Sequence, residues 1–138
     1  MTPQAQKPLP TPQPESDAYW QAAARGELLI QACADCGESQ FYPRNFCTAC
    51  GGRNVAFKKA SGKATLYTYA IVHQPPHPGF AGDVPYIAAI VELEEGVRMP
   101  TNIVGVEPEP ENLSIGMRLS VEFATVSDGV VLPKFRPA

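Results

Sequence analysis

Three features of the sequence predict a mainly β fold: an N-terminal helix, a four-cysteine ribbon and then a five-stranded barrel. Two Cys-x-x-Cys pairs lie within residues 33–50, one helical segment precedes them, and five strand-like segments follow between residues 63 and 135. With 138 residues, 44 % of them hydrophobic, the chain can form a real core. The expected organisation is a disordered tail over 1–14, the helix and ribbon over 15–59, and the barrel over 60–138.

The segment before the cysteines changes from a tail to a helix. Residues 1–14 contain five prolines and almost nothing apolar, so this part is expected to stay mobile. From residue 15 the sequence is helical, with Ser16 as the expected N-cap and Gly26 as the stop. A helix this short needs packing partners. Trp20 is therefore interpreted either as a docking anchor or as a wall of a ligand cleft.

The four cysteines predict a structural zinc site. They form two pairs separated by ten residues: Cys33 and Cys36, then Cys47 and Cys50. Each pair can turn two thiolates toward one point, as tetrahedral Zn²⁺ requires. Gly37 and Gly51 follow the pairs, where a positive φ is commonly needed. Four thiolates leave no position open for water, so the zinc is expected to be structural.

Disulfide bonds and a redox motif are the alternatives for these cysteines. No cleavable apolar leader precedes the helix, so we expect a cytoplasmic, reducing location in which thiols remain free for metal. Thiol oxidoreductases carry one such pair rather than two. No run of about 20 apolar residues and no lipidation signal is present, so no membrane association is expected.

Strand patterns flank and follow the cysteines. Strands are predicted on either side of the metal site, over residues 27–32 and 54–59, which is typical of a zinc ribbon. Five further strands are predicted, and their ranges are 63–74, 86–93, 98–104, 116–126 and 130–135. Because an open five-stranded sheet would expose its edges, we expect a closed barrel of the OB type, with an SH3-like barrel as the alternative.

Charge is distributed unevenly along the chain. The net charge is −3, yet no acidic side chain lies between Glu38 and Asp83. That stretch contains five cations: Arg44, Arg53, Lys58, Lys59 and Lys63. They can offset the thiolates or bind an anionic group such as phosphate. The acidic total disfavours binding to nucleic acid.

No catalytic constellation is evident in the sequence. There is no nucleophile elbow or phosphate loop, and the cysteines are committed to metal. His73 and His77, the only histidines, lie in a proline-rich loop without a third ligand at suitable spacing. This loop, with Phe80 expected to be exposed, is interpreted as a surface that docks on another protein or as an ordinary connection.

Short motifs along the chain resemble a known family. The matching motifs are Tyr19-Trp20, Cys33-x-x-Cys36-Gly37, Tyr42-Pro43-Arg44, Cys47-x-x-Cys50, Gly62-Lys63, Pro85-Tyr86-x-x-Ala89, Gly116 and Pro133-Lys134-Phe135. Over residues 15–138 the chain resembles small proteins with a rubredoxin-like zinc ribbon followed by an OB-fold. These proteins, long catalogued as a domain of unknown function, are linked to acyl-CoA metabolism.

The resemblance implies an accessory role without catalytic residues. Family members accompany thiolase-like enzymes, hydroxymethylglutaryl-CoA synthases or lipid-transfer-type aldolases and help to hold an acyl-CoA. The expected protein is thus a non-catalytic acyl-CoA-binding scaffold subunit of a thiolase-superfamily enzyme, in a hetero-oligomer. Arg44, Lys58 and Lys59 are the candidate contacts to CoA phosphates, and Trp20 and Phe80 the candidate cleft or partner contacts.

Two other functions remain open. Zinc ribbons and OB barrels also bind single-stranded nucleic acid, on which Phe57, Tyr67 or Tyr69 could stack, although the net charge opposes this. A stand-alone acyl-CoA hydrolase is the third hypothesis, and it lacks a visible nucleophile or base.

Overall fold

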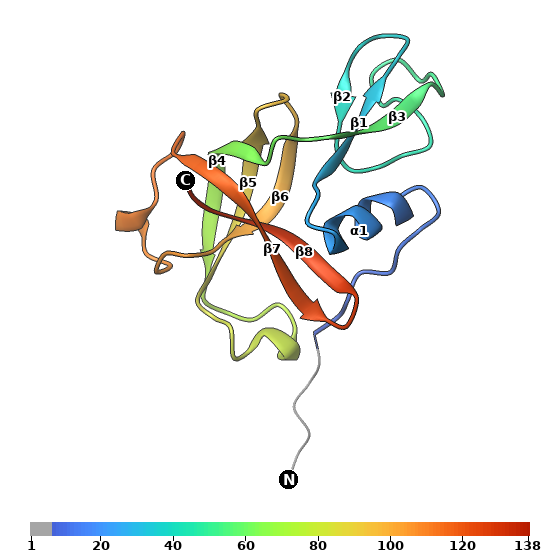
Figure 1. Ribbon diagram of the computed structural model, residues 1–138. Coiled ribbons are helices and arrows are strands. Elements are labelled where there is room, and N and C mark those ends of the chain that lie inside the picture. The colour runs from blue at the N-terminus through green and yellow to red at the C-terminus, as the bar shows by residue number, and fades with distance from the viewer. Residues whose placement is uncertain (1–6) are drawn as a thin grey trace.

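The computed structural model describes residues 7–138 as one helix, a small sheet and a barrel (Figure 1). The elements in chain order are α1 (Asp17–Ala24), β1 (Leu29–Cys33), β2 (Ser39–Gln40), β3 (Val55–Lys59), β4 (Lys63–Val72), η1 (Pro78–Phe80), β5 (Tyr86–Leu93), β6 (Arg98–Ile103), η2 (Pro110–Asn112), β7 (Arg118–Ser127) and β8 (Val130–Pro137). The predicted fold class is confirmed, and β2 and the two 3-10 turns are additions.

The first sheet forms the ribbon and has the strand order β2-β1-β3, all antiparallel. Strand β1 lies in the centre and pairs with a neighbour on each side. Gln31, for example, pairs with Gln40 of β2 and with Phe57 of β3. Strand β2 has two residues, too few to give a period-2 pattern, and for this reason the sequence did not reveal it. The cysteines lie at the ends and turns of this sheet.

The second sheet closes into a barrel with the order β4-β5-β6-β8-β7. Strand β4 pairs with both β5 and β7, and β7 and β8 form the hairpin predicted around Asp128-Gly129. The barrel closes between β6 and β8, which run parallel and share one residue pair, Ile103 with Phe135. This crossover of the last two strands is the Greek-key order of an OB-fold, so that prediction is confirmed.

The core fills the barrel and continues to the helix. Fully buried side chains come from all five barrel strands, among them Leu66, Val91, Met99, Leu119 and Phe135. On the ribbon side, Tyr19, Leu28 and Ile30 belong to the same hydrophobic cluster. Helix α1 packs against β1, β7 and β8, and it therefore fixes the ribbon against the barrel.

The helix ends as expected but begins differently. Gly26, with φ 81°, follows the last turn, and the backbone N–H groups of Gly26 and Glu27 donate to Ala23 and Ala22. Ser16 occupies the N-cap position without a side-chain cap bond. Its hydroxyl is buried and instead accepts from the Gln13 N–H at 3.0 Å. The expected cap is thus corrected: Ser16 ties the incoming chain to the helix start.

Gly62 directly precedes β4, the first strand of the barrel, and an alanine at this position is expected to destabilise the protein. Its φ is 85°, and an added Cβ would lie 2.6 Å from Val121 Cγ1 on β7. Left-handed strain and overpacking together predict a loss of about 3 kcal/mol for Gly62→Ala, measured by urea unfolding. Gly129→Ala is the control, since its φ is 72° but nothing lies within 4 Å of the added Cβ. Equal losses at both positions would contradict the steric argument.

The segment before the helix has no helix or strand over residues 7–14. Residues 1–6 of the predicted tail lie outside the described residues, and the mobility of residues 1–14 stays a prediction. Lys7 forms an ion pair with Asp83, so this segment runs along the barrel. Among the residues that the structure describes, no helix has the length and hydropathy needed to cross a membrane.

Candidate metal centre and its surroundings

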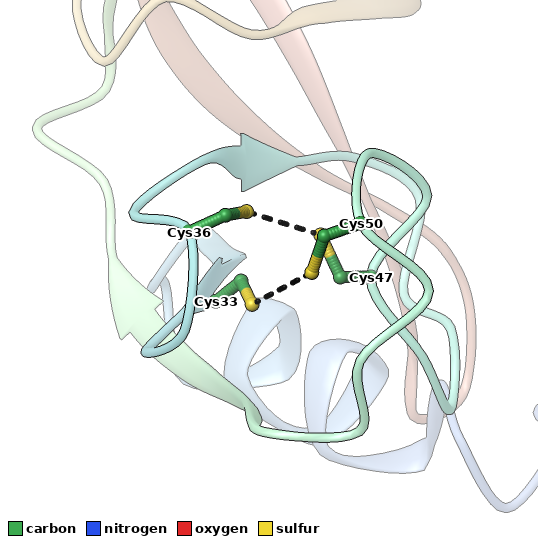
Figure 2. Close-up of side chains that lie close together, drawn as sticks. All are labelled: Cys33, Cys36, Cys47 and Cys50. Atoms are coloured by element: carbon green, nitrogen blue, oxygen red, sulfur yellow. Dashed lines mark hydrogen bonds between the residues drawn. The ribbon is translucent and has the colours of Figure 1, made fainter.

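The four cysteine side chains converge on one point between two loops (Figure 2). All four Sγ atoms lie within 4.8 Å of one another. Two of the distances are 3.7 Å, from Cys33 to Cys50, and 3.6 Å, from Cys36 to Cys47. A tetrahedral site with Zn–S bonds of about 2.3 Å has S···S edges of about 3.8 Å. The thiols therefore fit Zn²⁺, and all four are free of disulfides.

The backbone of each Cys-x-x-Cys pair forms the same tight turn. The N–H of Gly37 donates to the carbonyl of Cys33, and the N–H of Gly51 donates to that of Cys47, both at 2.9 Å. Gly37 and Gly51 have φ values of 79° and 77°, as predicted, because this turn places the residue after each pair in the left-handed region. The turns aim each pair of thiols inward.

The donor set defines the role of the metal. The four cysteines bind a structural zinc ion, since four protein thiolates complete its tetrahedral coordination. Backbone hydrogen bonds from Cys50 and Ala49 lower the pKa of the Cys47 thiol to about 7. This favours the thiolate of Cys47, which is the form that binds metal. For the Cys36 and Cys50 thiols, backbone hydrogen bonds lower the pKa, but burial and hydrogen bonds to the other thiols together outweigh them and raise it.

Two buried glutamines, which sequence reasoning missed, fix the loop between the cysteine pairs. Gln31 and Gln40 are 3 % and 7 % exposed. The Gln31 Oε1 atom accepts from Gln40 Nε2 and from the Arg44 N–H, each at 2.8 Å, while its Nε2 donates to the Arg44 carbonyl at 2.9 Å. Gln40 in turn binds the backbone of Phe46 and Thr48. The only sequence signal was Gln31 inside a predicted strand, and nothing marked Gln40.

An aromatic cluster joins the helix to the ribbon loop and lines a cleft. Tyr19 and Trp20 of α1 contact Phe41 and Tyr42, with ring centroids 4.9 to 6.5 Å apart across the cluster. The Trp20 Nε1–H donates to Tyr42 Oη at 3.0 Å. The cluster lines one side of a cleft of about 260 Å³, and β6 and β8 line the other. Trp20 is thus both an anchor and a cleft wall.

The predicted basic residues do not all converge. Arg44, Lys58 and Lys59 are exposed on the ribbon. Lys58 and Lys59 are neighbours on β3, so their side chains point to opposite faces of the sheet. Their contact with CoA phosphates stays a prediction.

Two family models match consecutive parts of the chain. Residues 20–56 match the rubredoxin-like zinc ribbon domain of ChsH2, and residues 57–124 match its C-terminal OB-fold domain. A DUF35 domain-containing scaffold protein of Methanocaldococcus jannaschii is 39 % identical over 118 residues, which cover 80 % of this chain and 81 % of that protein. The chain belongs to the DUF35 family.

Other relatives include longer proteins. A probable enoyl-CoA hydratase alpha subunit of Thermomonospora curvata is 36 % identical over 136 residues, 99 % of this chain. The chain spans 41 % of the length of that relative. Among solved structures, a chain of an assembly titled "Ltp2-ChsH2(DUF35) aldolase" is 35 % identical with a TM-score of 0.81, covering 93 % of this chain and 98 % of that one.

The loop that follows β4 in this DUF35 chain differs from the expectation in one respect. Phe80 was expected to be exposed, but it is half-buried, because its ring packs on Tyr86 with centroids 6.1 Å apart and lies under Lys7. The Nδ1 atom of His77 accepts from the Gly79 N–H at 2.9 Å and starts η1. Within residues 7–138 neither His73 nor His77 belongs to a metal-ligand cluster.

Proposed function

We propose that this DUF35 chain is a non-catalytic accessory subunit that binds a partner enzyme of the thiolase superfamily and helps to hold an acyl-CoA. The observation that carries the proposal is the close structural match over nearly the whole chain to the assembly titled "Ltp2-ChsH2(DUF35) aldolase". Relatives called scaffold proteins support the same role.

The chemistry of the described residues agrees with a supporting role. The protein's four thiolates fill the zinc coordination sphere, so the metal offers no position for substrate. In the described part of the chain, the four cysteines are the one group of three or more metal-ligating side chains gathered together. A rigid ribbon and barrel can instead complete a ligand cleft at an interface.

The candidate contacts to the partner and to CoA remain proposals. Trp20 borders the cleft between the helix and the barrel, and Phe80 borders a second cleft on the barrel, so each can contact a partner or a bound ligand. Arg44 with either Lys58 or Lys59 can bind a phosphate from one face of the ribbon. Because Lys58 and Lys59 face opposite ways, separate substitutions can identify which one acts.

Reconstitution with a thiolase-superfamily enzyme from the same source tests this function. Size-exclusion chromatography with light scattering should give a stoichiometric complex, and the partner's turnover of acyl-CoA should rise. Either Lys58→Glu or Lys59→Glu, but not both, should raise the KM for acyl-CoA. Arg118→Glu on β7, also an exposed cation, is the matched control. Failure to form a complex with any such enzyme would contradict the scaffold role.

The competing outcome is activity of the chain itself, as the name of the Thermomonospora relative suggests for that protein. The isolated chain should give no hydratase, aldolase or thioesterase turnover. Turnover that is lost in His73→Ala or His77→Ala would show that the loop histidines are catalytic, and it would replace the accessory role.

A further inference from the structure

A second cleft lies on the barrel beside the β6–β8 closure, away from the cysteines. Its volume is about 350 Å³, within the range of roughly 300–1,000 Å³ that holds small ligands. Its wall is mostly apolar and includes Phe80, Tyr86, Val104, Val126 and Leu132. We call it the Lys134 cleft, after the lysine of β8 that also lines it.

The N-terminal segment of residues 7–10 forms one side of the Lys134 cleft. Lys7 Nζ lies 2.5 Å from Asp83 and 5.7 Å from the centre of the Phe80 ring. No backbone hydrogen bond to another described residue holds residues 7–10. A partly exposed ion pair holds a segment weakly, so this side of the cleft can move to admit a ligand.

The charges around the Lys134 cleft leave one cation in excess. Lys7 and Asp83 neutralise each other, whereas Lys134 forms no ion pair within residues 7–138. Residues 1–6 contain no acidic side chain that could pair with it. Glu122 is opposite Lys134 on β7, but its carboxylate pairs with Arg136 at 3.7 Å. The cleft therefore combines an apolar wall with one unpaired positive charge.

The burial of Lys134 makes this charge costly without an anion. Its side chain is half-buried, and its pKa is lowered by that burial and by Lys7, against the opposing effect of Asp83. An anion placed beside the ammonium would restore the solvation that the cleft wall removes.

We propose that the Lys134 cleft binds a small monoanion with an apolar body, of the medium-chain carboxylate class. The carboxylate lies on Lys134, the alkyl chain lies against Phe80 and Tyr86, and residues 7–10 cover it. This inference goes beyond the accessory role and does not depend on it, because the chain alone should bind such a ligand.

Calorimetric titration of the full chain with three probes separates charge from hydrophobicity. Decanoate has both features, 1-decanol has the apolar body alone and acetate has the charge alone. Decanoate should bind at least about tenfold more tightly than 1-decanol, because a charged hydrogen bond adds that much affinity, and acetate should not bind measurably. Equal affinity for decanoate and 1-decanol, or no binding of decanoate, would overturn the proposal.

Substitutions of Lys134 locate the site. Lys134→Met should weaken decanoate binding by about tenfold, and Lys134→Arg should retain it. Lys63→Met is the matched control, since Lys63 is an exposed lysine on β4 that lines a different cleft. The melting temperature of Lys134→Met should not fall, because a half-buried charge without an ion pair is removed. Unchanged decanoate affinity in a folded Lys134→Met variant would place the ligand elsewhere.

Discussion

Removal of zinc is expected to unfold the ribbon and to detach it from the barrel. Apparent binding free energies of thiolate zinc sites are on the order of 10–16 kcal/mol, as large as the whole stability of a typical domain, about 5–15 kcal/mol. The ribbon sheet is small, with a two-residue strand β2, so the metal and the Gln31–Gln40 hydrogen bonds are the main supports of its loops. Chelation or Cys36→Ala should abolish zinc binding and the cooperative melting of the ribbon.

Metal analysis and circular dichroism measure this effect. Asn45→Ala, in the exposed loop between the cysteine pairs, is the control and should retain one zinc per chain. The barrel strands should keep part of their signal after chelation, since β4 to β8 close on themselves. An unchanged melting curve after complete metal removal would contradict a structural role for zinc.

The second large effect is expected from Gln31→Leu in the ribbon. Leucine has a similar size but removes the partner of the Arg44 N–H, of the Arg44 carbonyl and of one N–H of the Gln40 amide, whose other bond to Phe46 remains. Each partly buried polar group left without a hydrogen-bond partner costs about 1–3 kcal/mol. The free energy of unfolding should therefore fall by roughly 3 kcal/mol or more. Since the same loop leads into Cys47, zinc affinity should fall as well.

Competition with a chromogenic zinc chelator measures that affinity. Gln21→Leu is the matched control, because Gln21 is an exposed glutamine of α1 whose amide bonds Asp17 four residues earlier. It should leave both zinc affinity and stability nearly unchanged. If Gln31→Leu leaves zinc affinity and stability as little changed as Gln21→Leu does, water takes over the hydrogen bonds of the glutamine and the network does not support the site.

The features that the sequence predicted well are those set by nearby residues. The turn after each cysteine pair depends on a glycine one position away, so Gly37 and Gly51 were correctly placed at positive φ. The period-2 alternation around Leu119 indicated a half-buried strand, and β7 follows it. The zinc ligands and the closed OB-type barrel followed from such local signals together with the need to close sheet edges.

The features that the sequence did not reveal arise from contacts between distant segments. Gln31 and Arg44 are 13 residues apart, and no pattern in the chain marks their bonds. Phe80 looked exposed because its loop is rich in proline, yet Tyr86 and Lys7 cover it. Lys58 and Lys59 are adjacent in the sequence, but strand alternation sends their side chains to opposite faces of β3. Side-chain direction and tertiary covering decided each case.

The strand order also sets the order in which parts of the nascent chain can fold during synthesis. The ribbon sheet and all four cysteines lie within residues 29–59, so they leave the ribosome before the barrel strands. Strands β4, β5 and β6 follow as a meander whose two outer edges lack their final neighbours until β7 and β8 appear. Because α1 packs on β7 and β8 as well as on β1, its packing on the barrel is complete only after the last two strands have appeared. Synthesis thus passes through a stage with a finished metal knuckle and an open sheet, the form most exposed to aggregation and to chaperones.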